Sequence, residues 1–319
     1  MFFHYQLSVI SCQLSVMISF TLPSFAKINW FLRVLGKRRE DGFHEICTAF
    51  QTISLHDNLT FSKSETGEIS LSCDQPHIPV DERNLIFRAG VALGEKFGVK
   101  TGARIHLEKR IPAPGGLGGG SSNAAIALLG LARLWQIDAG FERLCEIGAA
   151  LGSDVPFFFF GGTALGTGRG TEISPVDERQ PNEKFMLVVA PEIDVPTAAA
   201  FEGLNAARLT NHSPKSILKI CRIEAEKLNL RQSVLINDFE PTIFKIQPEI
   251  RRVKEKLLRL GASRALMSGS GASVFAVFDK EETRQATLKA LESEEKNWRK
   301  FAVATISRSE YREALEITE

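Results

Sequence analysis

In the first third of the chain, runs of apolar residues predict strands, and one segment with apolar residues at helical spacing predicts a helix. Apolar and β-branched runs predict strands at residues 25–35, 46–55, 58–64, 68–73 and 103–107. The third and fourth of these runs flank Gly67, and we expect them to form a hairpin. Between residues 84 and 97 apolar residues recur at helical spacing, with Asp81 as a candidate cap.

The middle of the chain joins a glycine-rich stretch to helical patterns. Alanine and leucine at helical periodicity predict helices over residues 122–135 and 141–151. A tight turn at residues 152–156 follows, and the four phenylalanines at residues 157–160 predict a short apolar strand.

The second half mixes both kinds of element. Strands are predicted at residues 185–190, 272–278 and 301–306, and helices at residues 217–228, 248–260 and 281–293. Segregated strands and helices of this kind favour an α+β architecture. Prolines and charges cluster near residues 174–183, so we expect one domain over residues 17–178 and a second over residues 179–319.

Residues 1–16 are expected to be a non-structural extension, with Met17 as the natural beginning. The first twenty residues contain no Lys or Arg, whereas a signal peptide begins with a basic region. The apolar run is interrupted by Ser and Gln and is too short and polar to span a bilayer.

Composition narrows the classes of partner. The 39 basic and 38 acidic side chains give a formal net charge of +1, with no basic stripe, so neither nucleic acid nor a membrane surface is an expected partner. Five widely spaced cysteines without a C-x-x-C pair argue against disulfides or a zinc site and for a reducing cytoplasm. We expect a cytoplasmic protein, a monomer or a weak homodimer, that acts on a small molecule.

The glycine-rich stretch carries the clearest chemistry. Residues 115–120 contain five glycines and run directly into an Ala-rich helix that begins with Ser121 and Ser122. Glycines let backbone N–H groups approach an anion closely, and a helix N-terminus adds partial positive charge. The alternative is a flexible linker with a helix cap. The stretch lacks the G-K-[ST] of a Walker loop and the later acidic residue of a Rossmann fingerprint.

Five segments together identify a resemblance. They are residues 25–29 (FAKIN), 41–44 (DGFH), 84–86 (NLI), 112–125 (PAPGGLGGGSSNAA) and 151–157 (LGSDVPF). In this order they resemble the galactokinase, homoserine kinase, mevalonate kinase and phosphomevalonate kinase (GHMP) superfamily. Within it they are most similar to the members that phosphorylate the 2-hydroxyl of a cytidine diphosphate-linked methylerythritol in the non-mevalonate isoprenoid pathway.

The resemblance implies a two-domain GHMP kinase fold with the active site in the cleft between the domains. It implies that Asp154 is the catalytic base and that Lys27 lies beside it. By itself, Asp154 could be only a turn or cap residue, and Lys27 could face water from an edge strand. Asn29 shares a face with Lys27 by the two-residue period of a strand, so it is expected to face the substrate.

The resemblance also assigns the binding residues. The substrate would be bound by Asn29, Phe43, His44, Thr197 and Phe201. Phe43 and Phe201 would stack on the two faces of the cytosine, and His44 would hydrogen-bond its polar edge. ATP would be bound by Asn84, Lys109, Pro112, Gly115, Gly116, Leu117, Gly118, Gly119, Gly120, Ser121 and Ser122, and Mg²⁺ by Ser122. Plainer alternatives remain: a helix cap for Asn84, a solvated turn for Lys109, a half-buried pair for Phe43 and His44, and the start of a helix for Phe201.

Two rival functions stay open from the sequence. One is another GHMP small-molecule kinase of the homoserine or mevalonate type, against which the aromatic residues argue. The other is a non-catalytic ligand-binding relative, against which the presence of both Lys27 and Asp154 argues. A segment resembling the third superfamily motif, residues 267–275 (MSGSGASVF), is expected to abut the phosphate loop.

Overall fold

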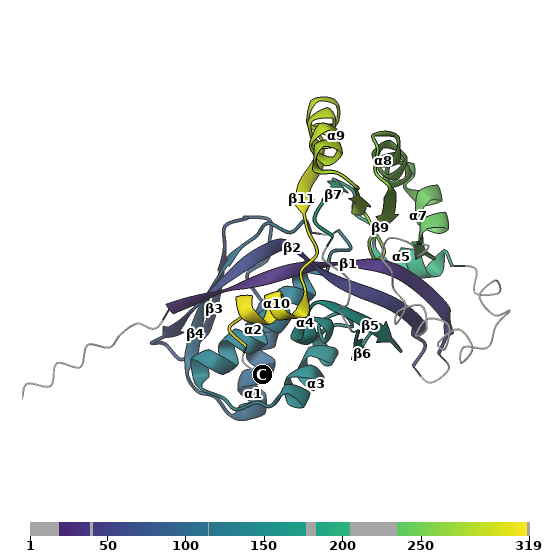
Figure 1. Ribbon diagram of the computed structural model, residues 1–319. Helices are drawn as coiled ribbons and strands as arrows, with labels where there is room; N and C mark the ends of the chain where they lie inside the picture. The colour runs from purple at the N-terminus through teal and green to yellow at the C-terminus, as the bar shows by residue number, and fades with distance from the viewer. Residues whose placement is uncertain (1–18, 39–40, 114, 177–182, 205–234, 318–319) are drawn as a thin grey trace, which may run out of the picture.

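The computed structural model describes residues 19–38, 41–113, 115–176, 183–204 and 235–317 (Figure 1). The extension expected at residues 1–16, the helix expected at residues 217–228 and the expected domain boundary after residue 178 lie outside these ranges. None of the described helices combines the length and the apolar character needed to cross a membrane.

Two sheets organise the fold. The larger has seven strands: β1 (Ser19–Lys37), β2 (His44–Ser64), β3 (Ile69–Cys73), β4 (Gly102–Glu108), β5 (Thr163–Thr167), β6 (Glu172–Pro175) and β8 (Ile236–Asn237). Its main order is β3-β4-β2-β1-β8, with β5 paired to β2 and β6 to β5. The smaller sheet has the order β11-β7-β10-β9, from β7 (Met186–Pro191), β9 (Arg264–Met267), β10 (Val274–Val277) and β11 (Trp298–Val303).

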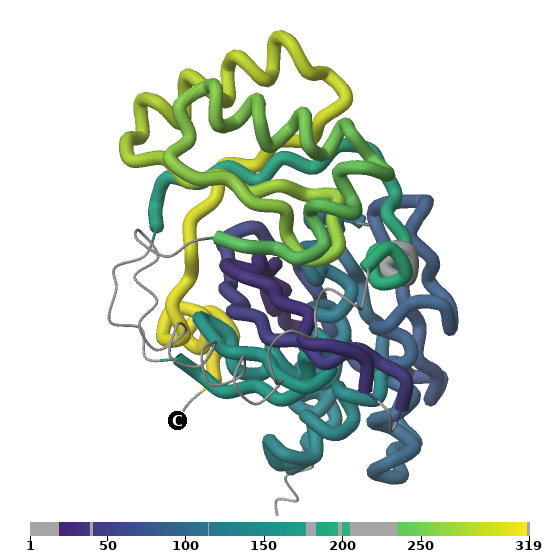
Figure 2. Tube along the Cα trace, turned by 90° about the vertical axis from the view of Figure 1, so that its right-hand side faces the viewer, coloured from purple at the N-terminus to yellow at the C-terminus, as the bar shows by residue number. Residues whose placement is uncertain are grey.

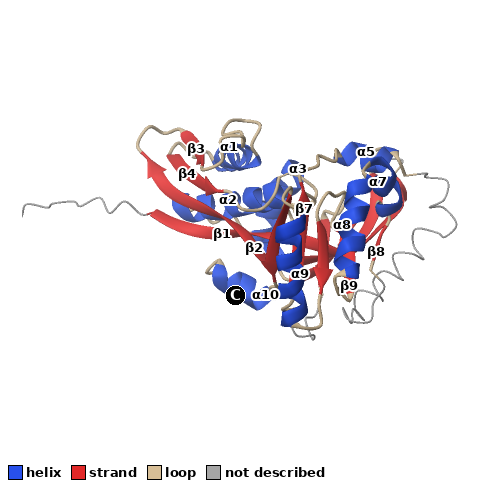
Figure 3. Ribbon diagram, turned by 90° about the horizontal axis from the view of Figure 1, so that it is seen from above, coloured by secondary structure: helices blue, strands red, loops and turns tan. Residues whose placement is uncertain are grey.

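Helices cover each sheet. The larger sheet packs against α1 (Leu85–Phe97), α2 (Gly119–Trp135), α3 (Phe141–Leu151) and α4 (Phe157–Phe160). The rest of the helices are α5 (Thr197–Glu202), α7 (Glu240–Ile246), α8 (Pro248–Arg259), α9 (Glu281–Glu294) and α10 (Arg308–Ala314). Seen from above, α8 and α9 lie over the smaller sheet (Figure 3), which they contact through β10 and β11 respectively. The expected α+β class is confirmed.

Strand β1 passes through the centre of the molecule. Residues 26–32 are all buried. Ala26, Ile28, Trp30 and Phe31 pack in a core shared with the smaller sheet, whereas Leu22 and Phe25, nearer the start of β1, pack with residues of α2. In this shared core the rings of Trp30 and of Phe275 from β10 form a T-shaped pair, with centroids 5.3 Å apart. A strand covered on both faces reads as a continuous apolar run, which is the pattern that predicted it.

Three predictions about the elements are wrong. The two strands predicted at residues 46–55 and 58–64 form the single strand β2. The strands around Gly67 exist, but β4 lies between β2 and β3, so β3 pairs with β4 in parallel and no hairpin forms. Residues 157–160 form the short helix α4 rather than a strand. An all-apolar run of four residues carries no periodicity to separate the two conformations, and here Phe157, Phe158 and Phe159 are all buried.

The C-terminus returns to the first half of the chain. In Figure 2 the yellow trace descends from the smaller sheet to the helices beside the larger one. There Tyr311 of α10 is fully buried, its ring tilts against Phe25 at 5.5 Å, and its hydroxyl donates to the Phe158 carbonyl. A Cβ on Gly161 would lie 2.2 Å from that ring. The last helix therefore packs in the core of the predicted first domain, although it lies within the predicted range of the second.

We predict that Tyr311→Ala lowers the free energy of unfolding by about 3–5 kcal/mol, because it leaves a large cavity in this core. Tyr311→Phe keeps the ring and should cost about 1–3 kcal/mol for the unpaired carbonyl. Urea denaturation followed by tryptophan fluorescence measures both. A loss below about 1 kcal/mol for the alanine variant would show that α10 is not part of the cooperative core.

Candidate active site

The glycine loop connects β4 to the N-terminus of α2. Helix α2 begins at Gly119, after Gly118 in the left-handed conformation (φ 71°), and its first hydrogen bond runs from Ser122 N–H to the Gly118 carbonyl at 2.8 Å. The backbone N–H groups ahead of Ser122 therefore have no partner within the helix. Such a terminus attracts anions.

A second loop holds the glycine loop from the other side. Ser268 donates from Oγ to the Gly116 carbonyl at 2.9 Å, and Ser273 N–H donates to the Gly115 carbonyl at 3.2 Å. A Cβ on Gly116 would lie 2.1 Å from the Ser268 carbonyl oxygen, and Gly116 has a φ of 70°. Only glycine fits there. The expectation that residues 267–275 abut the glycine loop is confirmed.

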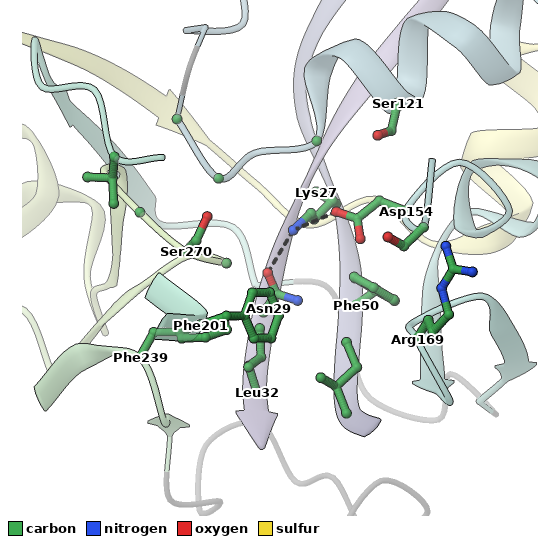
Figure 4. A pocket seen from close by; sticks show the side chains of 18 residues that line it. Lys27, Asn29, Leu32, Phe50, Ser121, Asp154, Arg169, Phe201, Phe239 and Ser270 are labelled. Atoms are coloured by element: carbon green, nitrogen blue, oxygen red, sulfur yellow. Dashed lines mark hydrogen bonds and ion pairs between the residues drawn. The ribbon is translucent and has the colours of Figure 1, made fainter. Parts of the chain in front are cut away.

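Lys27 lies between the glycine loop and a carboxylate. Its side chain is 3% exposed, and its Nζ is 3.2 Å from Asp154 Oδ2 and donates to Asn29 Oδ1 at 2.8 Å (Figure 4). Asn29 in turn donates to Thr48 Oγ1 at 2.8 Å. The backbone N–H of Lys27 donates to the Leu117 carbonyl at 2.9 Å, which ties β1 to the glycine loop.

Asp154 stands in the turn between α3 and α4. The turn is closed by a hydrogen bond from Val155 N–H to the Gly152 carbonyl at 3.2 Å. Val155 is fully buried, whereas the Asp154 side chain is 32% exposed. The turn therefore holds a carboxylate at the edge of solvent beside a buried ammonium group.

These groups line one pocket of about 290 Å³. Its walls come from Lys27, Asn29, Leu32, Ile46, Phe50, Gly115, Gly116, Gly118, Ser121, Ser153, Asp154, Arg169, Val195, Phe201, Phe239, Gly269, Ser270 and Gly271. Figure 4 shows Lys27, Asn29 and Asp154 grouped at its centre, with Ser121 at the end of α2 and Phe201 opposite. Segments from both halves of the sequence thus meet in it.

Aromatic side chains gather at one end of the pocket. The rings of His44 and Phe201 are stacked, with centroids 4.7 Å apart and planes at 22°, and Phe201 also meets Phe239 edge-on. Burial and the charge of Lys37 lower the pKa of His44, which favours the neutral ring. Phe43 does not line the pocket and is 51% exposed, while the Arg169 guanidinium lies 3.9 Å from its ring centroid. A centroid distance of 4.7 Å leaves no room for a base between His44 and Phe201.

Seven of the predicted ATP ligands do not line the pocket: Asn84, Lys109, Pro112, Leu117, Gly119, Gly120 and Ser122. Asn84 is the N-cap of α1, accepting from Ile86 N–H at 2.9 Å, so the cap expected at Asp81 is wrong. Lys109 forms a buried ion pair with Asp57 at 2.9 Å, and burial lowers the Lys109 pKa. Their nucleotide contacts stay predictions.

The side chains of Ser121 and Ser122, in the first turn of α2, lie in different environments. Ser122 is fully buried and accepts a hydrogen bond from Ser24 at 2.7 Å, whereas Ser121 lines the pocket. The role of Ser122 toward Mg²⁺ therefore stays a prediction. The described residues contain no group of three or more His, Cys, Asp or Glu that could hold a metal ion. Thr197 begins α5, and its side chain lies outside the described part of the structure.

Other functional positions were missed from the sequence. Arg169 and Phe239 line the pocket, and neither was expected there. The only signal for Arg169 was its position between Gly168 and Gly170. Asp57 is fully buried and accepts the backbone N–H groups of Arg110 and Ile111 at 2.7 and 2.8 Å, which fixes the approach to the glycine loop.

The sequence of this chain is similar to those of known proteins. The chain matches the model of the GHMP kinases N terminal domain over residues 84–162 and that of the GHMP kinases C terminal over residues 215–297. It is 38% identical over 256 residues to a 4-diphosphocytidyl-2-C-methyl-D-erythritol kinase of Brevibacillus brevis, covering 80% of this chain and 86% of that protein. A kinase of the same name from Shouchella clausii is 37% identical over 264 residues, covering 83% and 87%.

Solved structures agree. A crystal structure of 4-(cytidine 5'-diphospho)-2C-methyl-D-erythritol kinase superposes with a TM-score of 0.72 and 31% identity, covering 90% of this chain and 99% of that one. A homoserine kinase from Cytophaga hutchinsonii reaches a TM-score of 0.65 at 19% identity, covering 96% and 97%. At 19% identity, the similarity to the homoserine kinase concerns the fold alone.

We predict that Gly116→Ala lowers the free energy of unfolding by more than about 2 kcal/mol, because a Cβ there meets a backbone oxygen at positive φ. The matched substitution is Gly120→Ala in the first turn of α2, where a Cβ would reach only Leu85 at 3.8 Å. That change should raise stability by about 0.5–1 kcal/mol, since alanine is favoured in a helix. Equal effects in chemical denaturation would contradict the packing of the two loops.

Proposed function

This chain belongs to the 4-diphosphocytidyl-2-C-methyl-D-erythritol kinase family of GHMP kinases, and we propose that it transfers the γ-phosphoryl group of ATP to the 2-hydroxyl of 4-diphosphocytidyl-2-C-methyl-D-erythritol. It is a small-molecule kinase. The observation that carries the proposal is the Lys27–Asp154 pair in one pocket with the glycine loop at the N-terminus of α2.

The glycine loop fits the phosphates of the donor. The unpartnered N–H groups at the start of α2 supply hydrogen bonds to phosphate oxygens, and the helix dipole favours their charge. A Cβ on Gly118 would approach the Lys27 side chain to 3.0 Å, so glycine lets the loop and the ammonium group lie together. Mg²⁺, when bound with the nucleotide, neutralises charge on the phosphate oxygens, and Ser121 or Ser122 would be its nearest hydroxyl ligand from this loop.

Asp154 performs the proton transfer in this proposal. The acceptor O–H bond breaks and its proton passes to the carboxylate, while the acceptor oxygen forms a bond to the γ-phosphorus and the bond to the ADP oxygen breaks. Lys27 holds a positive charge 3.2 Å from that carboxylate, which stabilises negative charge on the acceptor oxygen. Asn29 fixes the ammonium group through its 2.8 Å hydrogen bond.

The aromatic end of the pocket supports the choice of acceptor. His44, Phe201 and Phe239 offer the flat apolar surface that a pyrimidine requires. Homoserine and mevalonate contain no aromatic group that would use it. Because Phe201 stacks on His44 with centroids 4.7 Å apart, stacking of the base on that face of Phe201 requires that the two rings separate.

The choice of acceptor is tested with a panel. In a coupled assay of ADP release we expect turnover with 4-diphosphocytidyl-2-C-methyl-D-erythritol and turnover at least about 100-fold lower in kcat/KM with homoserine or mevalonate, which lack the cytidine contacts. A higher kcat/KM with homoserine or mevalonate than with the cytidine compound would assign the chain to another GHMP activity. Tight binding of the cytidine compound without turnover would indicate a non-catalytic relative.

We predict that Asp154→Asn lowers kcat by about 10²–10⁴-fold, the range for loss of a general base. The amide keeps the size of the carboxylate, so the KM for ATP should change little. Steady-state kinetics with the same coupled assay measure both quantities. Near-normal kcat would place the base elsewhere or show that the reaction needs none.

A further inference from the structure

Residues 268–271 form a turn, here called the serine–glycine turn, that lies against the glycine loop and Lys27. Its last three residues line the pocket. The Ser268 hydroxyl donates to the Gly116 carbonyl at 2.9 Å, and a Cβ on Gly269 would lie 3.4 Å from Lys27 Nζ. A displacement of this turn would therefore reach the glycine loop directly.

The side chain of Asn237, in β8, holds the serine–glycine turn. Its Nδ2 donates to the Met267 carbonyl at 2.8 Å and to the Gly269 carbonyl at 2.7 Å, and its Oδ1 accepts the Phe239 backbone N–H at 3.0 Å. Carbonyls can only accept and a backbone N–H can only donate, so these neighbours fix which way the amide faces. Asn237 is 3% exposed, and both of its N–H groups are engaged.

The residues that follow Asn237 fix the same region. Glu240, the first residue of α7, accepts the Met267 backbone N–H at 3.0 Å. Asp238 accepts the backbone N–H of Val34 in β1 at 2.9 Å. The segment from Asn237 to Glu240 therefore connects the start of the serine–glycine turn to β1, the strand that also contacts the glycine loop.

The serine–glycine turn depends on such support. Gly269 and Gly271 have φ values of 57° and 95°, which only glycine adopts readily. A buried carbonyl that loses its donor is unfavourable, so without the Asn237 amide the turn should move. The glycine loop would lose the position that Ser268 gives it. Phosphate contacts from a loop require accurate placement of its N–H groups, and small displacements are costly.

We infer that Asn237 is a positioning residue for the donor phosphates, because it sets the serine–glycine turn and the turn sets the glycine loop. This rests on the proposed function, since ATP is the donor named there. Asn237 is not among the residues that line the pocket. It therefore acts through the turn and not by touching the nucleotide.

The direct test measures the KM of both substrates in the coupled assay. Asn237→Ala removes all three hydrogen bonds, whereas Asn237→Asp keeps the size of the side chain and removes only the two donors. Each variant should raise the KM for ATP about 10–100-fold, and this rise should exceed the rise in the KM for the acceptor at least about fivefold.

Asp238→Asn is the matched control. It exchanges the same two side chains in the opposite sense at the neighbouring position, and it keeps an oxygen that can accept the Val34 N–H. Asp238 does not line the pocket. This variant should change either KM less than about threefold, because the serine–glycine turn keeps all of its contacts.

Three kinetic outcomes would overturn the inference. The first is an unchanged KM for ATP in Asn237→Ala. The second is an equal rise of both KM values, which would indicate a general loosening of the fold. The third is a rise confined to Asn237→Asp, which would assign the effect to the introduced charge. If Asn237→Ala does not fold, Asn237→Ser carries the same comparison with a smaller expected rise, since its hydroxyl can still donate one hydrogen bond.

Hydrogen exchange without ligand separates this inference from the proposed function. In Asn237→Ala, mass spectrometry should show amide exchange that is faster by about 10-fold or more at residues 115–119 and 267–271, with unchanged exchange in α1. If the unmodified protein fails to phosphorylate the cytidine diphospho-polyol, the proposed function fails, whereas exchange at the glycine loop still tests Asn237. If the unmodified protein turns over and exchange at the glycine loop is unchanged in the variant, only the inference about Asn237 fails. Faster exchange throughout the chain would indicate general destabilisation and would also overturn it.

Discussion

The buried ammonium group of Lys27 is the constraint around which the site is arranged. A charge that is 3% exposed loses most of its hydration, which costs several kcal/mol unless partners compensate. Asp154 and Asn29 supply those partners, and Thr48 fixes Asn29 in turn. The turn before α4 and strands β1 and β2 are therefore tied to one cation.

The glycine loop depends on the same residue. Its Leu117 carbonyl accepts the Lys27 backbone N–H, and Gly118 lies against the Lys27 side chain. From the other side, Ser268 donates a hydrogen bond to the glycine loop. The loop that contains Ser268 is fixed in turn by Asn237, which donates hydrogen bonds to the carbonyls of Met267 and Gly269. Because each contact is made by backbone or by a buried side chain, the conformation of the glycine loop is set by the protein itself. Binding then costs little ordering of the loop.

In the proposed function, backbone groups bind the donor and side chains select the acceptor. The proposed donor site consists of the N–H groups at the start of α2, a surface that any nucleoside triphosphate could use. The proposed selectivity for the acceptor depends on side chains, among them Phe201, which lines the pocket and stacks on His44. The two sheets share the core around Trp30 and Phe275, an apolar contact that limits free motion between the halves that form these ends.

The sequence by itself determined most of the elements and the chemical type of the site. The continuous apolar run of β1, the alanine-rich α2 and the glycines before it have local signatures, and Lys27, Asn29 and Asp154 could be assigned from motifs around them.

Tertiary structure decided which strands pair and which distant residues come into contact. The residues flanking Gly67 are strands in either arrangement, but β4 rather than β2 pairs with β3, since pairing depends on where α1 returns the chain. Residues 157–160 form the helix α4 within the core, and a short apolar run has no periodicity that separates a helix from a strand. Arg169 and Asp57 were missed for the same reason: their partners, Phe43 and the backbone at residues 110–111, are distant in sequence, and only folding brings them together.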